Sequence, residues 1–189
     1  GAFFVLSHLA KANAPLLQKM AQSGHTVCNH TANHKDMTKC ENAQAFSAEL
    51  DALRQDCAAI GVPVANYYRP PQGRFCEKNL AWAKELGYRT IFWSFAYCDW
   101  DNDKQPDPAA ALKNILEHTH PGAVILLHPT SATNAEILPK LLEEWKAQGY
   151  RFGTLDELVA REHARREKEA NEPQSNYRTK KPKPTKETA

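Results

Sequence analysis

The sequence lacks long apolar runs and any large excess of charge of one sign. Its 189 residues include 24 lysines and arginines against 22 aspartates and glutamates, which gives a formal net charge of only +2. A charge so close to balance argues against a dedicated nucleic-acid binder. Apolar runs such as residues 123–127 are far shorter than the roughly 18–20 residues that span a bilayer. We therefore expect no nucleic acid as a partner and no transmembrane segment in this chain.

The sequence also lacks paired cysteines and nucleotide-binding motifs. Five cysteines, an odd number with no C-x-x-C pair, occur as Cys28, Cys40, Cys57, Cys76 and Cys98. Disulfide frameworks and zinc ribbons need paired cysteines at short, regular spacings, so we expect free thiols. Neither G-x-x-x-x-G-K-[ST] nor G-x-G-x-x-G is present, which leaves a nucleotide-binding or phosphoryl-transfer protein as a weak alternative.

The C-terminal segment, residues 161–189, contains no Val, Ile, Leu, Met, Phe or Trp. It holds nine lysines and arginines against five glutamates, a balance of +4. A segment without large apolar side chains cannot bury enough surface to offset its chain entropy. We predict a folded domain over residues 1–160 and a basic, largely disordered tail over 161–189, whose first part continues a helix. Attraction of this tail to an anionic polymer or a membrane surface is the alternative to a solvated tail.

Within residues 1–160, short apolar segments alternate with amphipathic ones. We predict strands at residues 3–6, 26–29, 66–68, 88–94, 123–128 and 150–153. We predict helices at residues 13–22, 43–60, 77–86, 108–118 and 134–148, and from 155 onward. Strands separated by helices indicate an α/β fold with parallel strands and right-handed crossovers. Six βα units in so short a chain fit an open sheet or an incomplete barrel, since a complete eight-fold barrel needs about 250 residues.

Polar and aromatic residues follow the predicted strands, where the loops of α/β folds converge on active sites. They are His30 and His34, Arg69, Asp99 with Trp100, and His128. The spacing of His30 and His34 would place both imidazoles on one face of a helical turn, which suits one divalent ion. Each residue alone has a structural explanation, such as a surface or core histidine, an ion-pairing arginine or a helix cap. Their occurrence at successive strand ends favours a shared site.

These residues resemble the motifs of polysaccharide deacetylases, the carbohydrate esterase family four with its NodB-homology domain. The matching segments are His30-Thr31-Ala32-Asn33-His34 for H-[ST]-x-x-H, Arg69-Pro70-Pro71-Gln72-Gly73 for R-x-P-x-G, Asp99-Trp100, and Leu126-Leu127-His128 for L-x-H. The resemblance covers about residues 1–158 in order. It implies a (β/α) deacetylase barrel related to the TIM barrel, here incomplete at the N-terminus.

A finer resemblance is to the δ-lactam-biosynthetic, muramic-acid de-N-acetylases of spore-forming bacteria. It rests on the W-S-x-A-x-x-D-W segment, residues 93–100, and on the Arg69-Pro70-Pro71 form of the third motif. It implies hydrolysis of N-acetyl groups in the peptidoglycan of the spore cortex, and a place in the cell envelope or outside the cell. Deacetylation of N-acetylglucosamine or of a chitin-type oligosaccharide is the alternative. The oligomeric state stays open.

The resemblance also implies the role of each site residue. His30 and His34 would bind a divalent metal ion, zinc in most of the family. His128 would be the general acid, oriented by Asp99, and Arg69 would hold a carboxylate, either the catalytic base or Asp99. The expected substrate contacts are Trp100 along the sugar groove, Leu126 at the acetate methyl pocket, and a backbone N–H near Tyr68 and Arg69 for the oxyanion.

The sequence departs from the family at its first motif, T-F-D-D-G, which would supply the catalytic base and the third metal ligand. That motif is absent, and the chain opens within an apparent strand at Gly1. We take this as an indication that the chain lacks its natural beginning, and we expect little activity from residues 1–189 alone. Two other motif positions differ, since Ala96 and Pro129 stand where the family often has Asp. A catalytically inactive, glycan-binding relative is therefore a further alternative.

Overall fold

The computed structural model describes residues 1–171, and the chain divides into two compact units. The first unit is Gly1–Thr154, and the second begins at Leu155. The described part of the second unit is a single helix, α7 (Leu155–Asn171). The predicted domain boundary at residue 160 falls inside α7. The prediction that the first part of the C-terminal segment continues a helix is confirmed. The rest of the predicted disordered tail, from residue 172 onward, lies outside the described residues.

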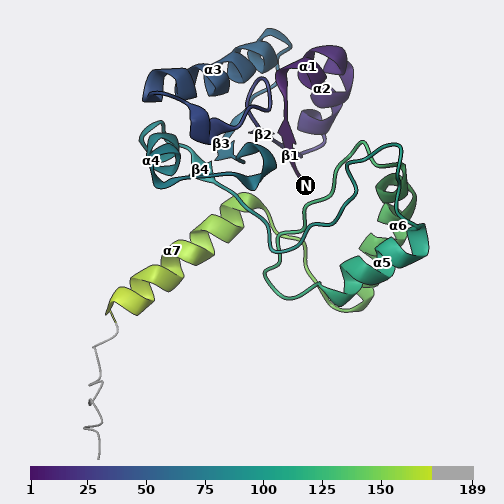
Figure 1. Cartoon of the computed structure of the whole chain (residues 1–189). Helices are drawn as coiled ribbons and strands as arrows, with labels where there is room; N and C mark the ends of the chain where they lie inside the picture. The colour runs from purple at the N-terminus through teal and green to yellow at the C-terminus, as the bar shows by residue number, and fades with distance from the viewer. Residues whose placement is uncertain (172–189) are drawn as a thin grey trace, which may run out of the picture. The chain divides into compact units, whose positions relative to one another are not determined.

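The first unit is built on a parallel sheet whose strands follow one another in chain order (Figure 1). The strands are β1 (Ala2–Val5), β2 (Thr26–Asn29), β3 (Ala65–Tyr68) and β4 (Arg89–Thr90). Each new strand joins the same edge, as in a barrel, whereas a doubly wound sheet reverses its order. The predicted α/β class with parallel βα units is confirmed.

Helices connect the strands, and polar side chains cap several of their N-termini. They are α1 (Ser7–Ala12), α2 (Ala14–Gln22), α3 (Ala43–Ala59), α4 (Glu77–Glu85), α5 (Pro108–Glu117) and α6 (Ala132–Ala147), with 3₁₀ turns η1 (Met37–Lys39) and η2 (Pro71–Gly73). Asn42, Asp107 and Ser131 each accept a hydrogen bond from the backbone N–H three residues later. These bonds satisfy N–H groups that lack a partner within the helix.

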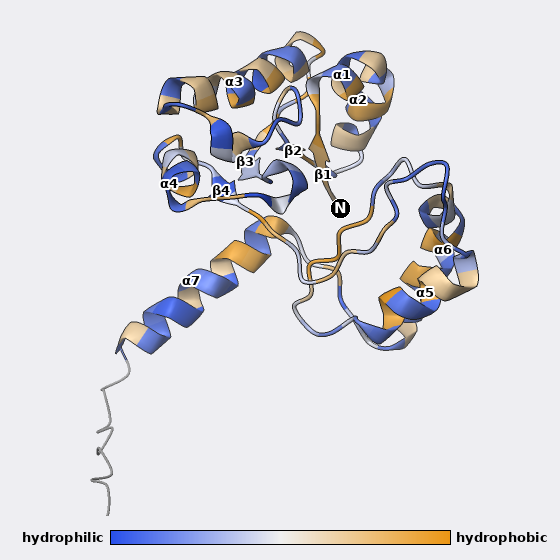
Figure 2. Ribbon diagram, in the orientation of Figure 1, coloured by the Kyte–Doolittle hydropathy of each residue, from blue (hydrophilic) through white to orange (hydrophobic). Residues whose placement is uncertain are grey.

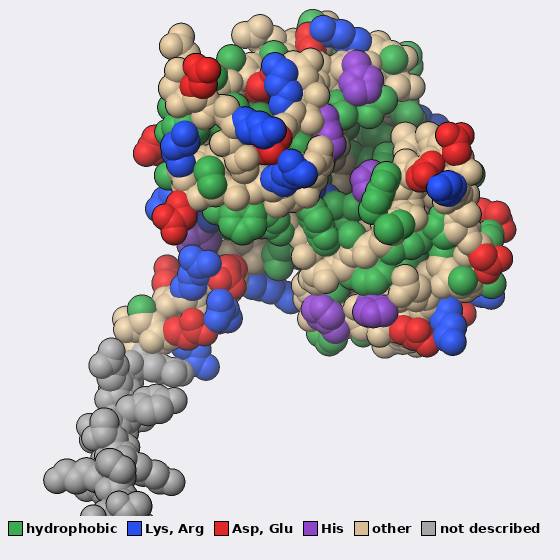
Figure 3. Space-filling model, in the orientation of Figure 1, with side chains coloured by type: hydrophobic (Ala, Val, Ile, Leu, Met, Phe, Trp, Pro, Cys, Tyr) green, Lys and Arg blue, Asp and Glu red, His purple; other side chains and the backbone are tan. Residues whose placement is uncertain are grey.

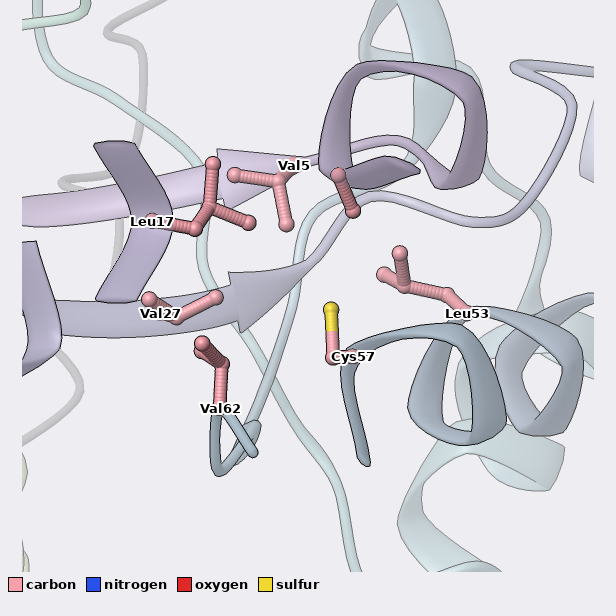
Figure 4. Close-up of a cluster of buried hydrophobic side chains, with 7 residues drawn as sticks. Val5, Leu17, Val27, Leu53, Cys57 and Val62 are labelled. Atoms are coloured by element: carbon pink, nitrogen blue, oxygen red, sulfur yellow. The ribbon is translucent and has the colours of Figure 1, made fainter. Parts of the chain in front are cut away.

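One face of β1 and β2 packs against α1, α2 and α3 to form a hydrophobic core (Figure 4). Val5 and Val27 share this face, because Val27 pairs with Phe3, two residues before Val5. The core cluster consists of Val5, Ala10, Leu17, Val27, Leu53, Cys57 and Val62. A second cluster, between α3 and α4, consists of Met37, Phe46, Leu50, Tyr68, Ala83 and Tyr88. A third, between α5 and α6, consists of Ala111, Ile115, Ile137, Leu141 and Trp145.

Three predicted strands are shorter than expected or absent. The strand predicted at 88–94 is reduced to β4, the segment 123–128 makes one isolated bridge between Phe95 and Ile125, and 150–153 is not a strand. A backbone ladder needs free carbonyl groups at regular intervals. Immediately after β4, the guanidinium of Arg69 donates to the carbonyl oxygens of Ile91 and Phe92. The Arg69 side chain therefore occupies backbone carbonyl oxygens that would accept hydrogen bonds from a neighbouring strand if β4 continued.

The helix predicted at 13–22 is preceded by another helix, α1, that the sequence did not indicate. Asn13 precedes α2, and an asparagine in this position often caps a helix by accepting a hydrogen bond through its side chain. In the structure, its Nδ2 donates to the carbonyl oxygen of Leu9 at 3.0 Å, and no side-chain cap bond forms for α2. Asn13 therefore joins two short helices.

Figure 2 shows that α7 is mainly hydrophilic beyond its first residues. On the exposed surface of α7, Glu162 forms salt bridges with Arg165 at 2.8 Å and with Arg166 at 2.7 Å. Across residues 1–171, no helix combines the length and the apolar character that a membrane span requires.

Replacing Leu53 with Ala tests the core between β1, β2 and α3. Leu53 is fully buried, so its truncation leaves a cavity. We expect the free energy of unfolding to fall by about 2–5 kcal/mol in denaturant titrations. The control Leu16→Ala, at a position 50% exposed, should change it by less than about 0.5 kcal/mol. Equal effects of the two variants would contradict this account of the core.

Candidate active site

The loop after β2 places the imidazoles of His30 and His34 side by side, with ring centroids 5.0 Å apart. The predicted helical turn is wrong, because residues 30–36 form no helix. Thr31 and His34 instead adopt positive φ angles of 74° and 54°. The Thr31 N–H donates to Asn29 Oδ1, and the His34 N–H donates to Thr31 Oγ1. These side-chain bonds stabilise a turn that β-branched Thr rarely adopts.

Glu49 of α3 holds the same loop from the other side. Its carboxylate accepts from the backbone N–H of Asn33 at 3.1 Å, from Asn33 Nδ2 at 3.0 Å, and from Lys35 Nζ at 2.7 Å. Burial acts to raise the pKa of Glu49, but the bonds from Lys35 and Asn33 outweigh it and hold that pKa below its ordinary value. The segment between the two histidines is therefore tied to a buried, ionised group on a helix.

His30 is held as a neutral imidazole. Burial lowers its pKa to about 4, and the nearby charges of His34, Arg69 and His128 add to this effect against the bond to Arg69. Its Nδ1 lies 2.8 Å from the carbonyl oxygen of Arg69, which only accepts, so Nδ1 carries the proton. Nε2 is then the nitrogen with a free lone pair. Metal-binding histidines in proteins are usually oriented in this way, because the ring nitrogen that does not bind the metal donates a hydrogen bond to a carbonyl or carboxylate oxygen.

The pair fits part of a zinc donor set. Two imidazoles bound to one tetrahedral zinc at about 2.0–2.1 Å have ring centres about 5 Å apart, and the observed separation of the His30 and His34 rings agrees with this. Burial also lowers the pKa of His34, with contributions from His128 and His8, which favours the neutral form that binds metal. Within residues 1–171, no cluster of three or more His, Cys, Asp or Glu is placed to hold an ion, so His30 and His34 stay two predicted ligands.

Asp99 and His128 form a hydrogen-bonded pair. His128 Nδ1 lies 2.7 Å from Asp99 Oδ1, and the His128 backbone N–H donates to Asp99 Oδ2 at 2.7 Å. The Asp99 side chain is fully buried, whereas that of His128 is 40% exposed. Burial acts to raise the pKa of Asp99, but bonds from His128 and Asn134 outweigh it and hold that pKa below its ordinary value. The carboxylate is therefore ionised and orients an imidazole that reaches solvent.

The substrate contacts predicted for Trp100 and Leu126 stay predictions, and the structure shows where these side chains lie. The exposed Trp100 ring meets the His128 ring edge-on, with centroids 6.0 Å apart. Ile125 and Leu127 pack on the third hydrophobic cluster, so alternation along this extended segment directs Leu126 to the same side as His128. An aromatic ring thus lies beside the accessible imidazole.

Arg69 is not paired with Asp99, which corrects one of the two partners predicted for it. Its guanidinium stacks on the Phe4 ring at 3.9 Å and donates to the carbonyl oxygens of Ile91 and Phe92. Burial lowers the pKa of Arg69 to about 10, so it stays charged at neutral pH. Arg69 thus joins the ends of β1, β3 and β4. The other predicted partner, the catalytic base, stays a prediction.

A backbone N–H near Tyr68 and Arg69 as the oxyanion donor stays a prediction, but one of the candidate N–H groups has another acceptor. The Arg69 N–H already donates to the carbonyl oxygen of Asn29 at 3.0 Å. The Tyr68 side chain is fully buried and packs edge-on against Phe46, with ring centroids 5.6 Å apart. Tyr68 therefore belongs to the core rather than to the substrate surface.

The two histidine groups face a common region. The charge of His128 contributes to the lowered pKa of both His30 and His34. Figure 3 shows histidine side chains around a hollow in one face of the first unit, bordered by hydrophobic side chains. The site thus combines two neutral imidazoles with a third imidazole that is hydrogen-bonded to a buried carboxylate.

Sequence reasoning missed Glu49, Tyr97 and Asn134. Glu49 interrupts the apolar face of its helix, since Phe46, Leu50 and Leu53 are its neighbours on that face, and this could have marked it. No motif pointed to Tyr97 or Asn134, which are hydrogen-bonded to each other 37 positions apart, while Asn134 also bonds to Asp99, 35 positions away.

Comparison with known proteins agrees with this geometry. The family model described as polysaccharide deacetylase matches residues 1–91. Peptidoglycan-N-acetylmuramic acid deacetylase PdaA from Bacillus subtilis is 38% identical over 160 residues, which are 84% of this chain and 60% of that protein. The solved structure of Bacillus subtilis PdaA, a family 4 carbohydrate esterase, superposes with a TM-score of 0.81 over 86% of this chain and 69% of that one. The chain therefore belongs to the polysaccharide deacetylase family.

Not every relative is an enzyme. A family 4 carbohydrate esterase pseudoenzyme from Bacillus anthracis is 27% identical, with a TM-score of 0.74 over 84% of this chain and 55% of that one. The chain spans about three fifths of the length of the curated relative PdaA. Family membership thus leaves the activity of the whole protein to be tested.

Replacing Asp99 with Asn tests the charge of the buried carboxylate. Because its pKa is lowered on folding, its stabilising effect is complete above the unfolded-state pKa of about 3.9 and is lost as pH falls through the folded-state value. At pH 7, we expect the variant to lose about 1–3 kcal/mol of unfolding free energy. Denaturant titrations from pH 7 to pH 3 should show this difference shrinking below about pH 4. A difference independent of pH would show that Asp99 is not ionised.

Proposed function

We propose that the protein is a metal-dependent N-deacetylase that hydrolyses acetamide groups on amino sugars of a cell-wall polysaccharide. The observation that carries this proposal is the buried Asp99–His128 pair, whose imidazole faces the His30–His34 pair. Family membership supports the reaction class.

The reaction adds water to the acetyl carbonyl carbon and breaks the carbon–nitrogen bond, which releases acetate and leaves an amine on the sugar. His30 and His34 would hold a divalent ion, for which zinc suits neutral imidazole ligands. Such an ion supplies Lewis-acid activation of water and of the carbonyl group. His128 donates a proton to the departing nitrogen, and ionised Asp99 stabilises the imidazolium that this step requires. Leu126 and Trp100 border the space next to His128, where they would contact the acetyl methyl group and the sugar ring.

For the substrate, we infer peptidoglycan, with muramic acid as the sugar that loses its acetyl group. The relative PdaA is named for this sugar, and other relatives are named peptidoglycan-N-acetylglucosamine deacetylase or chitooligosaccharide deacetylase. Action on peptidoglycan would place the protein in the cell envelope or outside the cell. A role in sporulation follows if the muramic acid lies in spore cortex.

Glycan binding without catalysis is the second candidate function. The pseudoenzyme among the relatives shows that this fold occurs without activity. Acetate release by the whole protein separates the two functions.

Alanine variants of the three site histidines should separate metal binding from acid catalysis. In the whole protein, His30→Ala and His34→Ala should each lower both the metal content and the release of acetate from peptidoglycan. His128→Ala should keep the metal and lower kcat by about 10²–10⁴-fold, the usual contribution of a general acid. Metal content per chain, measured by mass spectrometry, and acetate release per folded molecule are the two readouts.

The control for these variants is His120→Ala, an exposed histidine whose ring lies against the neighbouring carbonyl oxygen of Pro121. It should change neither readout. Full metal content in both His30→Ala and His34→Ala would place the ion elsewhere. An unchanged kcat in folded His128→Ala would remove His128 from the mechanism.

A further inference from the structure

Behind the Asp99–His128 pair, a chain of hydrogen bonds continues through Asn134 to Tyr97. Asn134, in the first turn of α6, donates from Nδ2 to Asp99 Oδ2 at 2.6 Å and to the His128 carbonyl oxygen at 3.1 Å. Asn134 Oδ1 accepts from the Tyr97 hydroxyl group. The Asn134 side chain is buried, and both ends of its amide have partners.

The chemistry of its neighbours fixes which way the Asn134 amide points. Ionised Asp99 and the His128 carbonyl group can only accept hydrogen bonds, so the amide NH₂ must face them. The opposite orientation would bring three oxygen atoms together. The hydroxyl of Tyr97 can then only donate to the remaining Oδ1. Burial, with the charge of Asp99, raises the pKa of Tyr97, so the phenol keeps this proton.

The start of α6 is fixed as well, so Asn134 has little freedom to move. Ser131 caps this helix by accepting from the Asn134 N–H at 3.2 Å, and its own hydroxyl donates to Gln105 Oε1 at 2.7 Å. The same Gln105 oxygen accepts from the Thr133 N–H. A buried polar network with all its members bonded restricts each of them to one arrangement.

This arrangement determines how Asp99 can act on His128. Two donors, the Asn134 amide and the His128 backbone N–H, occupy Oδ2, which leaves Oδ1 for the imidazole. If Asp99 were protonated on Oδ2, that proton would face two N–H donors and would have no acceptor. His128 Nδ1 must therefore donate to Oδ1, and Nε2 is the nitrogen available for transfer of a proton.

We propose that Asn134 and Tyr97 are positioning residues, which hold Asp99 in one rotamer and so keep His128 in the tautomer with its proton on Nδ1. This inference rests on the proposed function, in which His128 donates a proton from Nε2. The other titratable groups that face this pair are His30 and His34, on the loop after β2. Asn134 and Tyr97 act through Asp99.

Histidine ring ¹⁵N NMR of the whole protein, without substrate, measures the tautomer directly. The His128 signals, among those of eight histidines, are identified by their loss in His128→Ala. At a pH where His128 is neutral, the wild-type protein should show the Nδ1–H tautomer. Asn134→Ala should shift the population toward Nε2–H, and Tyr97→Phe should shift it in the same direction to a smaller extent. Tyr150→Phe is the matched control, since its hydroxyl donates to the Thr119 carbonyl oxygen, and it should leave the tautomer unchanged.

Kinetics supply the second readout. Misplacement of a catalytic group by about 1 Å can cost 10²-fold in rate, so we expect Asn134→Ala to lower kcat for acetate release by up to that factor with little change in KM. A purely structural role would lower the melting temperature and leave the tautomer and kcat per folded molecule unchanged, which would overturn the proposal. If Asn134→Ala does not fold, an unchanged tautomer and kcat in Tyr97→Phe have the same consequence. Absence of acetate release by the wild-type protein would overturn the proposed function, and the tautomer shifts would still decide the positioning role.

Discussion

The buried carboxylate of Asp99 is the constraint on which this half of the site depends. An ionised carboxylate removed from water costs several kcal/mol unless hydrogen bonds replace its hydration. Here, the donors come from the end of the 123–128 segment and from the first turn of α6. The Ser131 cap and the packing of α5 on α6 place that turn, while the bridge between Phe95 and Ile125 aligns the two segments that end in Asp99 and His128. The local fold from residue 93 to residue 147 thus serves to pair one carboxylate with one imidazole.

The other half of the site is organised around different buried charges. Glu49 fixes the loop between His30 and His34, and the carbonyl oxygen of Arg69 orients His30. The Arg69 guanidinium in turn closes the ends of the strands on which these residues stand. Each half contains a buried charged group, Asp99 in one and Glu49 in the other, that fixes the segment carrying an imidazole or the imidazole itself. Histidine serves both purposes, because its neutral form is a metal ligand and its charged form is an acid near neutral pH.

Much of this arrangement could be predicted from the sequence. Local periodicity located β2 and α3 to within a residue, and the positions after strands identified His30, His34, Asp99 and His128. What the sequence could not reveal depends on contacts between distant segments. The 123–128 segment has the composition of a strand but makes a single bridge, and Arg69 prefers backbone carbonyl groups to the carboxylate of Asp99. The partnership of Asn134 with Asp99, 35 positions away, leaves no local pattern.

We propose that this protein removes acetyl groups from the amino sugars of peptidoglycan. The most direct measurement is mass spectrometry of glycan fragments after incubation of purified peptidoglycan with the whole, metal-loaded protein. We predict that muramic acid residues lose one acetyl group and gain a primary amine, in an amount equal to the acetate released, while N-acetylglucosamine residues stay intact. Loss of acetyl groups from N-acetylglucosamine alone would correct the substrate. Fully acetylated glycan after incubation with folded protein would contradict the account.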